Sequence, residues 1–163
     1  FTNFANTNIN DITFIIVKVM ILKNISIEET DKIISEIKDY LKPNFTIALI
    51  GELGTGKTYL TSKTANFIGV NNTICSPTFT ILNQYKISNN FFFNHFDVYR
   101  IGNIEELEFI GYYDYLENPN YLNVIEWADK IYEQLPKSNL VIITIEYSQS
   151  DIKKRNYEIK KIK

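Results

Sequence analysis

Apolar residues along the chain fall into short runs that alternate with segments of helical periodicity. Runs with the length and composition of buried strands are expected at residues 20–24, 45–50, 80–87, 91–99, 121–125, 140–147 and 157–162. Apolar positions three or four residues apart predict helices over residues 26–41, 58–68, 103–110 and 128–135. This order predicts a layered α/β fold with a mixed, mostly parallel sheet, helices on both faces, and an antiparallel hairpin at residues 88–90.

A glycine-rich segment connects the expected strand at residues 45–50 to the helix that follows it. Its sequence, GELGTGKT, satisfies the spacing G-x-x-x-x-G-K-[ST] of a phosphate-binding loop. The glycines let successive backbone N–H groups turn inward, and the positive end of the helix dipole points at the bound phosphates. The residues expected to bind the nucleotide are Gly51, Glu52, Leu53, Gly54, Thr55, Gly56, Lys57 and Thr58.

Lys57 and Thr58 carry the chemistry of this loop. Lys57 supplies a compact cation for the β- and γ-phosphates, and the hydroxyl group of Thr58 is a ligand for Mg²⁺. The flanking strand and helix are the context that such a loop requires, so a plain connection between core elements is the weaker interpretation. The sequence therefore predicts a P-loop NTPase-like fold that binds a nucleoside triphosphate.

Two of the expected strands each deliver a carboxylate, Asp97 near the end of one and Glu126 directly after the other. In the first of these strands, Phe93, His95, Asp97 and Tyr99 share one face. A strand holds such a carboxylate rigidly near the phosphates, where it can bind a metal ion or orient water. The alternatives are a turn residue for Asp97 and a water-facing glutamate for Glu126. Both residues stay candidates for the direct metal ligand.

The segment SPTF, residues 76–79, follows the first helix of the nucleotide site and has the composition of an ordered turn. A loop that senses the γ-phosphate usually lies here in phosphate-loop proteins, so Ser76 or Thr78 is expected to contact the metal ion or its water. The alternative is a simple connection. His95, the only histidine, is expected to be a hydrogen-bonded strand side chain, and no cluster of Cys and His supports a zinc site.

Composition indicates one domain in a reducing compartment. The 163 residues carry a net charge of −2, which predicts no direct nucleic-acid footprint for the whole molecule. Cys75 is the only cysteine, so no internal disulfide can form and a cytoplasmic location is expected. The apolar run at residues 12–19 is too short to cross a membrane. Met20, the only methionine, is the expected start, with residues 1–19 a disordered or non-native extension and 20–163 a single ATPase domain.

Basic residues gather near the C-terminus. They are expected to protect a solvated edge strand, and contact with RNA or a partner is the alternative. These residues are Lys153, Lys154, Arg155, Lys160, Lys161 and Lys163.

The residues alone favour an ATPase but leave a small-molecule kinase as the alternative. Such kinases usually close an arginine-bearing lid over ATP, whereas this chain has arginine only at positions 100 and 155. A GTP-driven switch would need an Asn-Lys-x-Asp base reader and an Asp-x-x-Gly switch after a strand, and the sequence contains neither.

Five segments together resemble the TsaE (YjeE) family. The segments are GELGTGKT at 51–58, SPTF at 76–79, HFDVYR at 95–100, EELEFIG at 105–111 and IEW at 125–127. The resemblance runs from about Met20 to the C-terminal strand. The phosphate loop alone is unspecific within its superfamily, whereas its combination with H-x-D-x-Y-R and E-W is highly specific. The departures are Tyr59, where a small hydroxyl residue is common, and the first nineteen residues, which have no counterpart.

The resemblance implies a Mg²⁺-dependent ATPase needed to install threonylcarbamoyl on the adenosine beside the anticodon of tRNAs that read codons starting with A. It implies a ternary complex with TsaD, which performs the transfer, and TsaB, so that tRNA is contacted only through the complex. By position, Lys57 and the loop hold phosphates, while Thr58 and Glu126 resemble the Mg²⁺ ligands. Asp97 resembles the essential acidic residue near the γ-phosphate, and Trp127 resembles its conserved neighbour.

Overall fold

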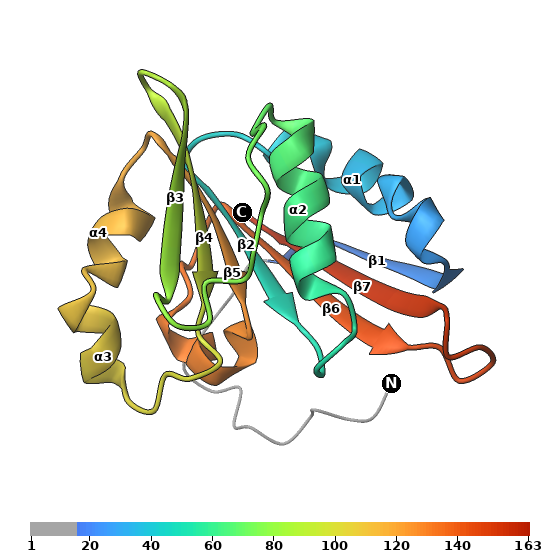
Figure 1. Ribbon diagram of the computed structural model, residues 1–163. Coiled ribbons are helices and arrows are strands. Elements are labelled where there is room, and N and C mark those ends of the chain that lie inside the picture. The colour runs from blue at the N-terminus through green and yellow to red at the C-terminus, as the bar shows by residue number, and fades with distance from the viewer. Residues whose placement is uncertain (1–15) are drawn as a thin grey trace.

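The computed structural model describes residues 16–163, which form a seven-stranded sheet covered by helices (Figure 1). The order across the sheet is β1-β7-β6-β2-β5-β4-β3. The strands are β1 (Ile16–Ile25), β2 (Phe45–Ile50), β3 (Leu82–Ser88), β4 (Phe91–Asp97), β5 (Tyr121–Glu126), β6 (Leu140–Tyr147) and β7 (Arg155–Ile162). The glycine-rich loop therefore leaves from β2, at the centre of the sheet.

The sheet is mixed, as predicted, but its parallel part is confined to the four central strands. β2 pairs in parallel with β6 and β5, and β5 pairs in parallel with β4. The outer pairings of β3 with β4, β6 with β7 and β1 with β7 are antiparallel. Because β3–β4 and β6–β7 are joined by short turns, these strands can only return antiparallel. The sheet is thus partly, not mostly, parallel.

Helices cover both faces, as predicted, and each face has its own hydrophobic core. α1 (Asp31–Ile37) and α2 (Lys57–Phe67) cover one face, with the short 3₁₀ turns η1 (Ile27–Glu29) and η2 (Lys38–Tyr40) beside α1. α3 (Ile104–Phe109), α4 (Tyr112–Glu117) and the 3₁₀ segment η3 (Ala128–Gln134) pack on the other face. None of these helices, within residues 16–163, is long and apolar enough to span a membrane.

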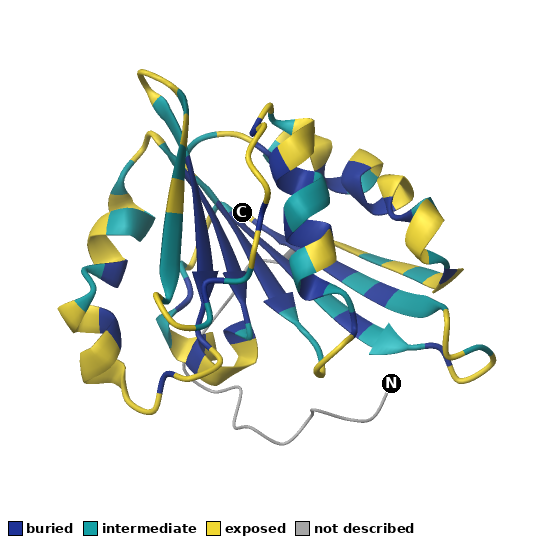
Figure 2. Cartoon of the chain, viewed as in Figure 1, coloured by how far each residue is buried: buried dark blue, intermediate teal, exposed yellow. Residues whose placement is uncertain are grey.

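β2 is buried on both faces, which explains its uninterrupted apolar sequence. Ile47 and Leu49 belong to the core under α1 and α2, whereas Ala48 belongs to the opposite core. A strand covered on both sides needs apolar residues at every position instead of an alternating pattern. Figure 2 shows the central strands as the most deeply buried part of the molecule. The two cores therefore fix the point at which the phosphate loop begins.

The sequence pattern does not predict α4. Gly111, with φ of 70°, separates α3 from α4 and allows the chain to turn between two helices of six residues each. Tyr112 is fully buried, and its ring packs edge-on against Phe96 with centroids 5.6 Å apart. Tyr112 is therefore part of the core under α4. A helix of six residues is too short to show a clear apolar period.

The first strand begins earlier than predicted. β1 starts at Ile16, and residues of the segment 16–19 pair with β7. The expectation of a strand start at Met20 is therefore wrong, because β7 is long enough to offer partners to the preceding residues. Residues 1–15 lie outside the described residues, so the assignment of an N-terminal extension stays a prediction.

β7 is not the edge strand that its lysines indicate, because it lies between β1 and β6. Lys161 is buried, and its Nζ donates a hydrogen bond to the Glu36 carbonyl oxygen at 2.7 Å. The Nζ atom also lies 4.8 Å from the centroid of the Tyr40 ring. The edge prediction is wrong because β1, from the other end of the chain, covers β7, and no local pattern reveals such a pairing.

Candidate phosphate-binding site

The glycine-rich loop leaves the carboxyl end of β2 at Gly51 and enters α2 at Lys57. A side chain at Gly51 has no room, because a Cβ atom there would lie 2.5 Å from the Ile145 carbonyl oxygen. Gly56 has φ of 104°, in the left-handed region that glycine adopts without strain. The predicted order of strand, loop and helix around this motif is confirmed, and the start of α2 directs its dipole at the loop.

Lys57 is a buried cation at the mouth of this loop. Its Nζ donates hydrogen bonds to the carbonyl oxygens of Gly51 at 2.7 Å and Glu52 at 2.9 Å. The same atom lies 3.7 Å from the centroid of the Trp127 ring, a cation–π contact. Burial lowers the pKa of Lys57, and the nearby charges of Glu126, Asp129 and Asp97 oppose that shift. Among the described residues, no carboxylate lies within 4 Å of the ammonium group.

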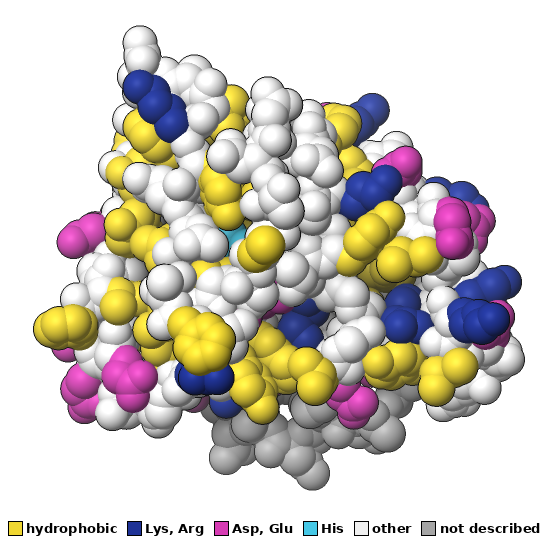
Figure 3. Space-filling view, viewed as in Figure 1, with side chains coloured by type: hydrophobic (Ala, Val, Ile, Leu, Met, Phe, Trp, Pro, Cys, Tyr) yellow, Lys and Arg dark blue, Asp and Glu magenta, His cyan; other side chains and the backbone are white. Residues whose placement is uncertain are grey.

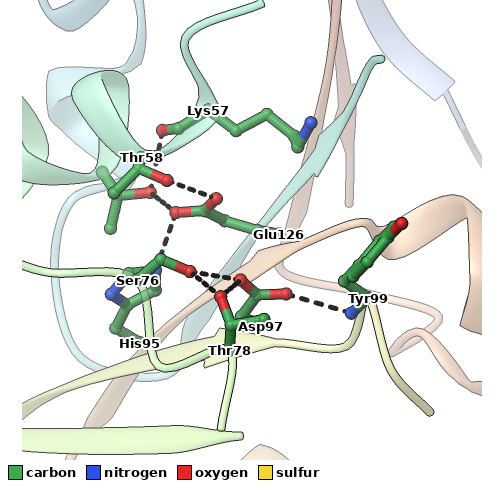
Figure 4. Close-up of polar contacts among 9 residues, drawn as sticks. Lys57, Thr58, Ser76, Thr78, His95, Asp97, Tyr99 and Glu126 are labelled. Carbon is green, nitrogen blue, oxygen red and sulfur yellow. Dashed lines mark hydrogen bonds and ion pairs between the residues drawn. The ribbon is translucent and has the colours of Figure 1, made fainter. Parts of the chain in front are cut away.

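Glu126 is the carboxylate that meets the loop (Figure 4). It lies at the end of β5, almost fully buried. Thr58 Oγ1 donates to its Oε2 at 2.8 Å, and Thr61 Oγ1 donates to its Oε1 at 3.0 Å. His95 Nε2 is 2.7 Å from the same Oε1, which accepts its hydrogen. Three side chains from α2 and β4 therefore fix the direction in which this carboxylate points.

Asp97 has a different set of partners. Its Oδ2 accepts hydrogen bonds from the hydroxyl groups of Ser76 and Thr78, the latter at 3.0 Å. Its Oδ1 accepts from the backbone N–H of Tyr99 at 3.0 Å. Two side-chain hydrogen bonds, from Ser76 and Thr78 to Asp97, therefore hold the SPTF segment at the end of β4 (Figure 4).

The structure brings the two predicted carboxylates side by side. Asp97 and Glu126 are register partners at the carboxyl ends of adjacent parallel strands. Trp127 directly follows Glu126 in a left-handed conformation with φ of 62°, which places its ring under Lys57. Arg100 lies outside this group, with its guanidinium 4.2 Å from the centroid of the exposed Phe79 ring.

His95 and Thr61 are site residues that the sequence reasoning did not assign to Glu126. The expected hydrogen-bonded role of His95 is confirmed, but its partner emerges only from the sheet register, which sets β4 beside β5. Thr61 is one helical turn after Thr58, and that spacing is a signal that could have found it. His95 Nδ1 is buried with no hydrogen-bond partner among the described residues.

Tyr147 and Arg155 brace the loop from its outer side, which the sequence reasoning also missed. Tyr147 Oη donates to the Leu53 carbonyl oxygen at 3.1 Å. The Arg155 guanidinium donates to the carbonyl oxygens of Thr55 at 3.1 Å and Gly54 at 3.3 Å, and lies 4.1 Å from the centroid of the Tyr147 ring. Three successive carbonyl groups of the loop are thus held by the end of β6 and the start of β7. No local sequence signal predicts these contacts, because they depend on β6 lying beside β2.

The oxygen donors at this site suit a hard divalent cation. The Thr58 hydroxyl and the Glu126 carboxylate are already in contact, and oxygen ligands of this kind are those that Mg²⁺ prefers. Within the described part of the chain, no three His, Cys, Asp or Glu side chains gather into a ready-made metal cage. A cation here would need further oxygen ligands from phosphate groups or water, as is usual for Mg²⁺ at nucleotide sites.

Comparison with known proteins identifies the relatives of this chain. The sequence profile described as "Threonylcarbamoyl adenosine biosynthesis protein TsaE" matches residues 25–157. The proteins named tRNA threonylcarbamoyladenosine biosynthesis protein TsaE from Haemophilus influenzae and Bacillus subtilis are 36% and 35% identical to it. The first alignment covers 68% of each chain and the second 74% of each. The relative of the same name from Rickettsia typhi is 36% identical over 80% of this chain and 92% of its own.

A solved structure shares the fold. The crystal structure of Bacillus subtilis YdiB superposes with a TM-score of 0.67 at 27% sequence identity. The superposition covers 90% of this chain and 87% of that one. The similarity therefore extends over most of the chain.

Proposed function

The chain belongs to the TsaE family of threonylcarbamoyl adenosine biosynthesis proteins, and from this premise we propose that it is a Mg²⁺-dependent ATPase of tRNA modification. Its hydrolysis of ATP serves threonylcarbamoylation of the adenosine beside the anticodon in tRNAs that read codons starting with A. The transfer itself belongs to a TsaB–TsaD pair on which this chain acts in the cytoplasm. Contact with tRNA is made through that pair.

The observation that carries the ATPase proposal is the state of Lys57. A buried ammonium group is costly unless an anion compensates it, yet Lys57 directly contacts two carbonyl oxygens and an indole ring. The carboxylates of Glu126, Asp129 and Asp97 are near enough to favour its charge but form no ion pair with it. The compensating charge is expected to come from the substrate, since the loop around Lys57 has the spacing and backbone conformation of a phosphate cradle. The β- and γ-phosphates of ATP would supply that charge.

Thr58 and Glu126 are the residues proposed to hold Mg²⁺. The hydroxyl and carboxylate oxygens fit the ion, and Thr61 and His95 keep the carboxylate directed at Thr58. When bound, Mg²⁺ neutralises charge on the phosphate oxygens during transfer of the phosphoryl group. Outer contacts of this kind commonly set the affinity of a metal site as strongly as the ligands themselves.

Asp97 is proposed to act close to the γ-phosphate through the loop that it holds. Its carboxylate accepts hydrogen bonds from the hydroxyl groups of Ser76 and Thr78. Movement of the SPTF segment would bring one of these hydroxyl groups to the attacking water or take it away. Lys57 neutralises charge on the phosphates, and the start of α2 adds its N–H groups. Hydrolysis by the isolated chain is expected to be slow and to accelerate when a partner sets this loop in place.

The first test compares ATP hydrolysis by the wild-type chain with that of Lys57→Ala and Asp97→Ala. Each variant is expected to lose about 100-fold or more in turnover, because each removes a group that acts on the transferred phosphate or on the loop beside it. Lys38→Ala and Asp39→Ala, two exposed positions on η2, serve as matched controls and should hydrolyse ATP at the wild-type rate. Wild-type turnover in Lys57→Ala or Asp97→Ala would contradict the assigned roles.

A further inference from the structure

A shallow groove lies beside α3, on the side of the sheet that α3 and α4 cover. Its volume is about 330 Å³, enough for one or two side chains of another molecule. We term this hollow the α3 groove. It is lined by Ile81, Asn103, Glu105, Glu106, Phe109 and Ile110. None of these six residues contributes a side chain to the contacts described above for Lys57, Asp97 and Glu126.

Apolar side chains are unusually exposed around this groove. Phe109, the last residue of α3, is 93% exposed, and Ile104, its first residue, is 47% exposed. Phe79, in the SPTF segment that precedes Ile81, is 85% exposed, and the Arg100 guanidinium lies against its ring. Figure 3 shows hydrophobic and acidic side chains lying together over α3, at the lower left of the molecule. Exposed apolar groups that gather in this way mark interaction surfaces.

Carboxylates predominate along α3 beside the groove, although the Arg100 guanidinium lies against the neighbouring Phe79 ring. Residues 101–129 contain seven carboxylates and no lysine or arginine, although the whole chain has a net charge of only −2. Glu105, Glu106 and Glu108 are exposed on α3, and none of them forms an ion pair with another described residue. A surface with an apolar centre and an acidic rim is complementary to apolar side chains flanked by lysine or arginine.

Ile81 connects this groove to the candidate catalytic loop. Its backbone N–H donates to the Pro77 carbonyl oxygen at 2.6 Å, and its own carbonyl oxygen accepts from the Asp97 N–H at 2.9 Å. Ile81 also has φ of 66°, a left-handed conformation that is strained for a β-branched residue. A contact on this side chain therefore reaches the SPTF segment and the strand end that holds Asp97.

We propose that the α3 groove docks a partner protein through a surface of apolar side chains flanked by basic ones, and that docking acts on residues 76–81. The inference rests on the proposed function, since it names the surface through which a partner raises ATP turnover. RNA is disfavoured as the occupant because its phosphates meet unpaired carboxylates. A second copy of this chain is disfavoured because two acidic rims would face each other.

The test measures binding of a purified TsaB–TsaD pair to this chain and the ATP turnover of the mixture. Phe109→Asp and Glu105→Lys are each expected to weaken binding about tenfold and to lower stimulation at a fixed concentration of the pair. Basal turnover without the pair and the melting temperature should not change, because both positions are exposed and lie outside the nucleotide site. Phe67→Asp on α2 and Asp39→Lys on η2 are the matched controls and should bind as wild type.

The outcomes separate the docking inference from the function on which it rests. If the wild type is stimulated and both groove variants bind and respond equally well, the docking inference is wrong and the proposed function survives. If the wild-type chain neither binds the pair nor responds to it, the proposed function fails and takes this inference with it. Binding of tRNA alone that Phe109→Asp abolishes would assign the groove to RNA and overturn the proposal.

Discussion

Among single residues, Arg155 shows how a distant side chain can shape the phosphate loop. Its guanidinium donates to two successive loop carbonyl oxygens while Tyr147 holds a third. With these carbonyl groups fixed on the outside, the N–H groups of Gly54 and Gly56, in two of the same peptides, can face a phosphate, whereas the Thr55 N–H donates to the Glu52 carbonyl oxygen at 3.3 Å. In the sequence Arg155 belongs to a cluster of basic residues near the C-terminus, whereas in the structure it positions the backbone of the glycine-rich loop.

Replacement of Arg155 by Met should weaken ATP binding more than it slows turnover. Loss of two charge-assisted hydrogen bonds to a half-buried loop is expected to raise the Kd for ATP about fivefold to tenfold. Arg155→Lys should recover little of this affinity, because an ammonium group lacks the planar fork that reaches both carbonyl oxygens. Calorimetric titration with a non-hydrolysable ATP analogue, together with KM and kcat, measures the effect.

The matched control for Arg155 is Lys153→Met, which removes an exposed charge from the same turn. It should leave the Kd for ATP unchanged. A purely structural role for Arg155 would instead lower the melting temperature and kcat while the Kd stayed at the wild-type value, and that pattern would contradict the positioning role.

Among the elements, strands β3, β4 and β5 are tied together by a line of amide side chains. Gln84 Nε2 donates to Asn94 Oδ1 at 2.9 Å, and Asn94 Nδ2 donates to Asn123 Oδ1 at 2.9 Å. Asn123 Nδ2 then donates to the Tyr115 carbonyl oxygen on α4 at 3.1 Å. Because Asn94 and Asn123 are buried, each must keep its partners or lose stability. This line fixes the relative position of the strands that carry Asp97 and Glu126.

Asn123→Ala is therefore expected to destabilise the fold. The change leaves a buried amide of Asn94 and the Tyr115 carbonyl group unpaired, which should lower the free energy of unfolding by about 1–3 kcal/mol. Urea denaturation followed by circular dichroism measures the loss. Gln84→Ala, at the exposed end of the line, should cost less than about 0.5 kcal/mol. Equal losses in the two variants would show that burial of the amides does not decide their contribution.

Secondary structure near the phosphate loop follows from local sequence, whereas several tertiary partners do not. The run at residues 45–50, the glycine spacing and the helix after it predict β2, the loop and the start of α2, and all are present. α4 escapes prediction because a six-residue helix carries too little periodicity. The pairing of β1 with β7 escapes it because the partners come from opposite ends of the chain.

At the scale of the whole molecule, the residues of the candidate site can be predicted from the sequence, whereas their tertiary contacts cannot. Lys57, Thr58, Asp97 and Glu126 are recognisable because each lies in a motif or at a strand end. Their contacts with His95, Tyr147 and Arg155 need the strand order, which sets β4 beside β5 and β6 beside β2. Sequence thus predicts which residues carry the chemistry, and the register of the sheet decides what holds them in place.

The whole molecule presents two candidate functional regions, the proposed phosphate loop at the carboxyl ends of the central strands and the acidic, apolar surface on α3. The SPTF segment and Ile81 lie between them, with Asp97 bonded to both. This arrangement favours a protein whose ATP turnover is controlled by a partner. It is less suited to one that hydrolyses ATP independently. The role of the chain would then be to drive the partner's cycle of tRNA modification.

The most direct test of this account measures ATP hydrolysis with and without a purified TsaB–TsaD pair while tRNA threonylcarbamoylation is scored in the same mixture. We predict slow hydrolysis by the chain alone, faster hydrolysis with the pair, and sustained tRNA modification only when the chain is present. Lys57→Ala should abolish both the stimulated hydrolysis and the sustained modification. Turnover that does not respond to the pair, together with modification that proceeds equally well without the chain, would contradict the account.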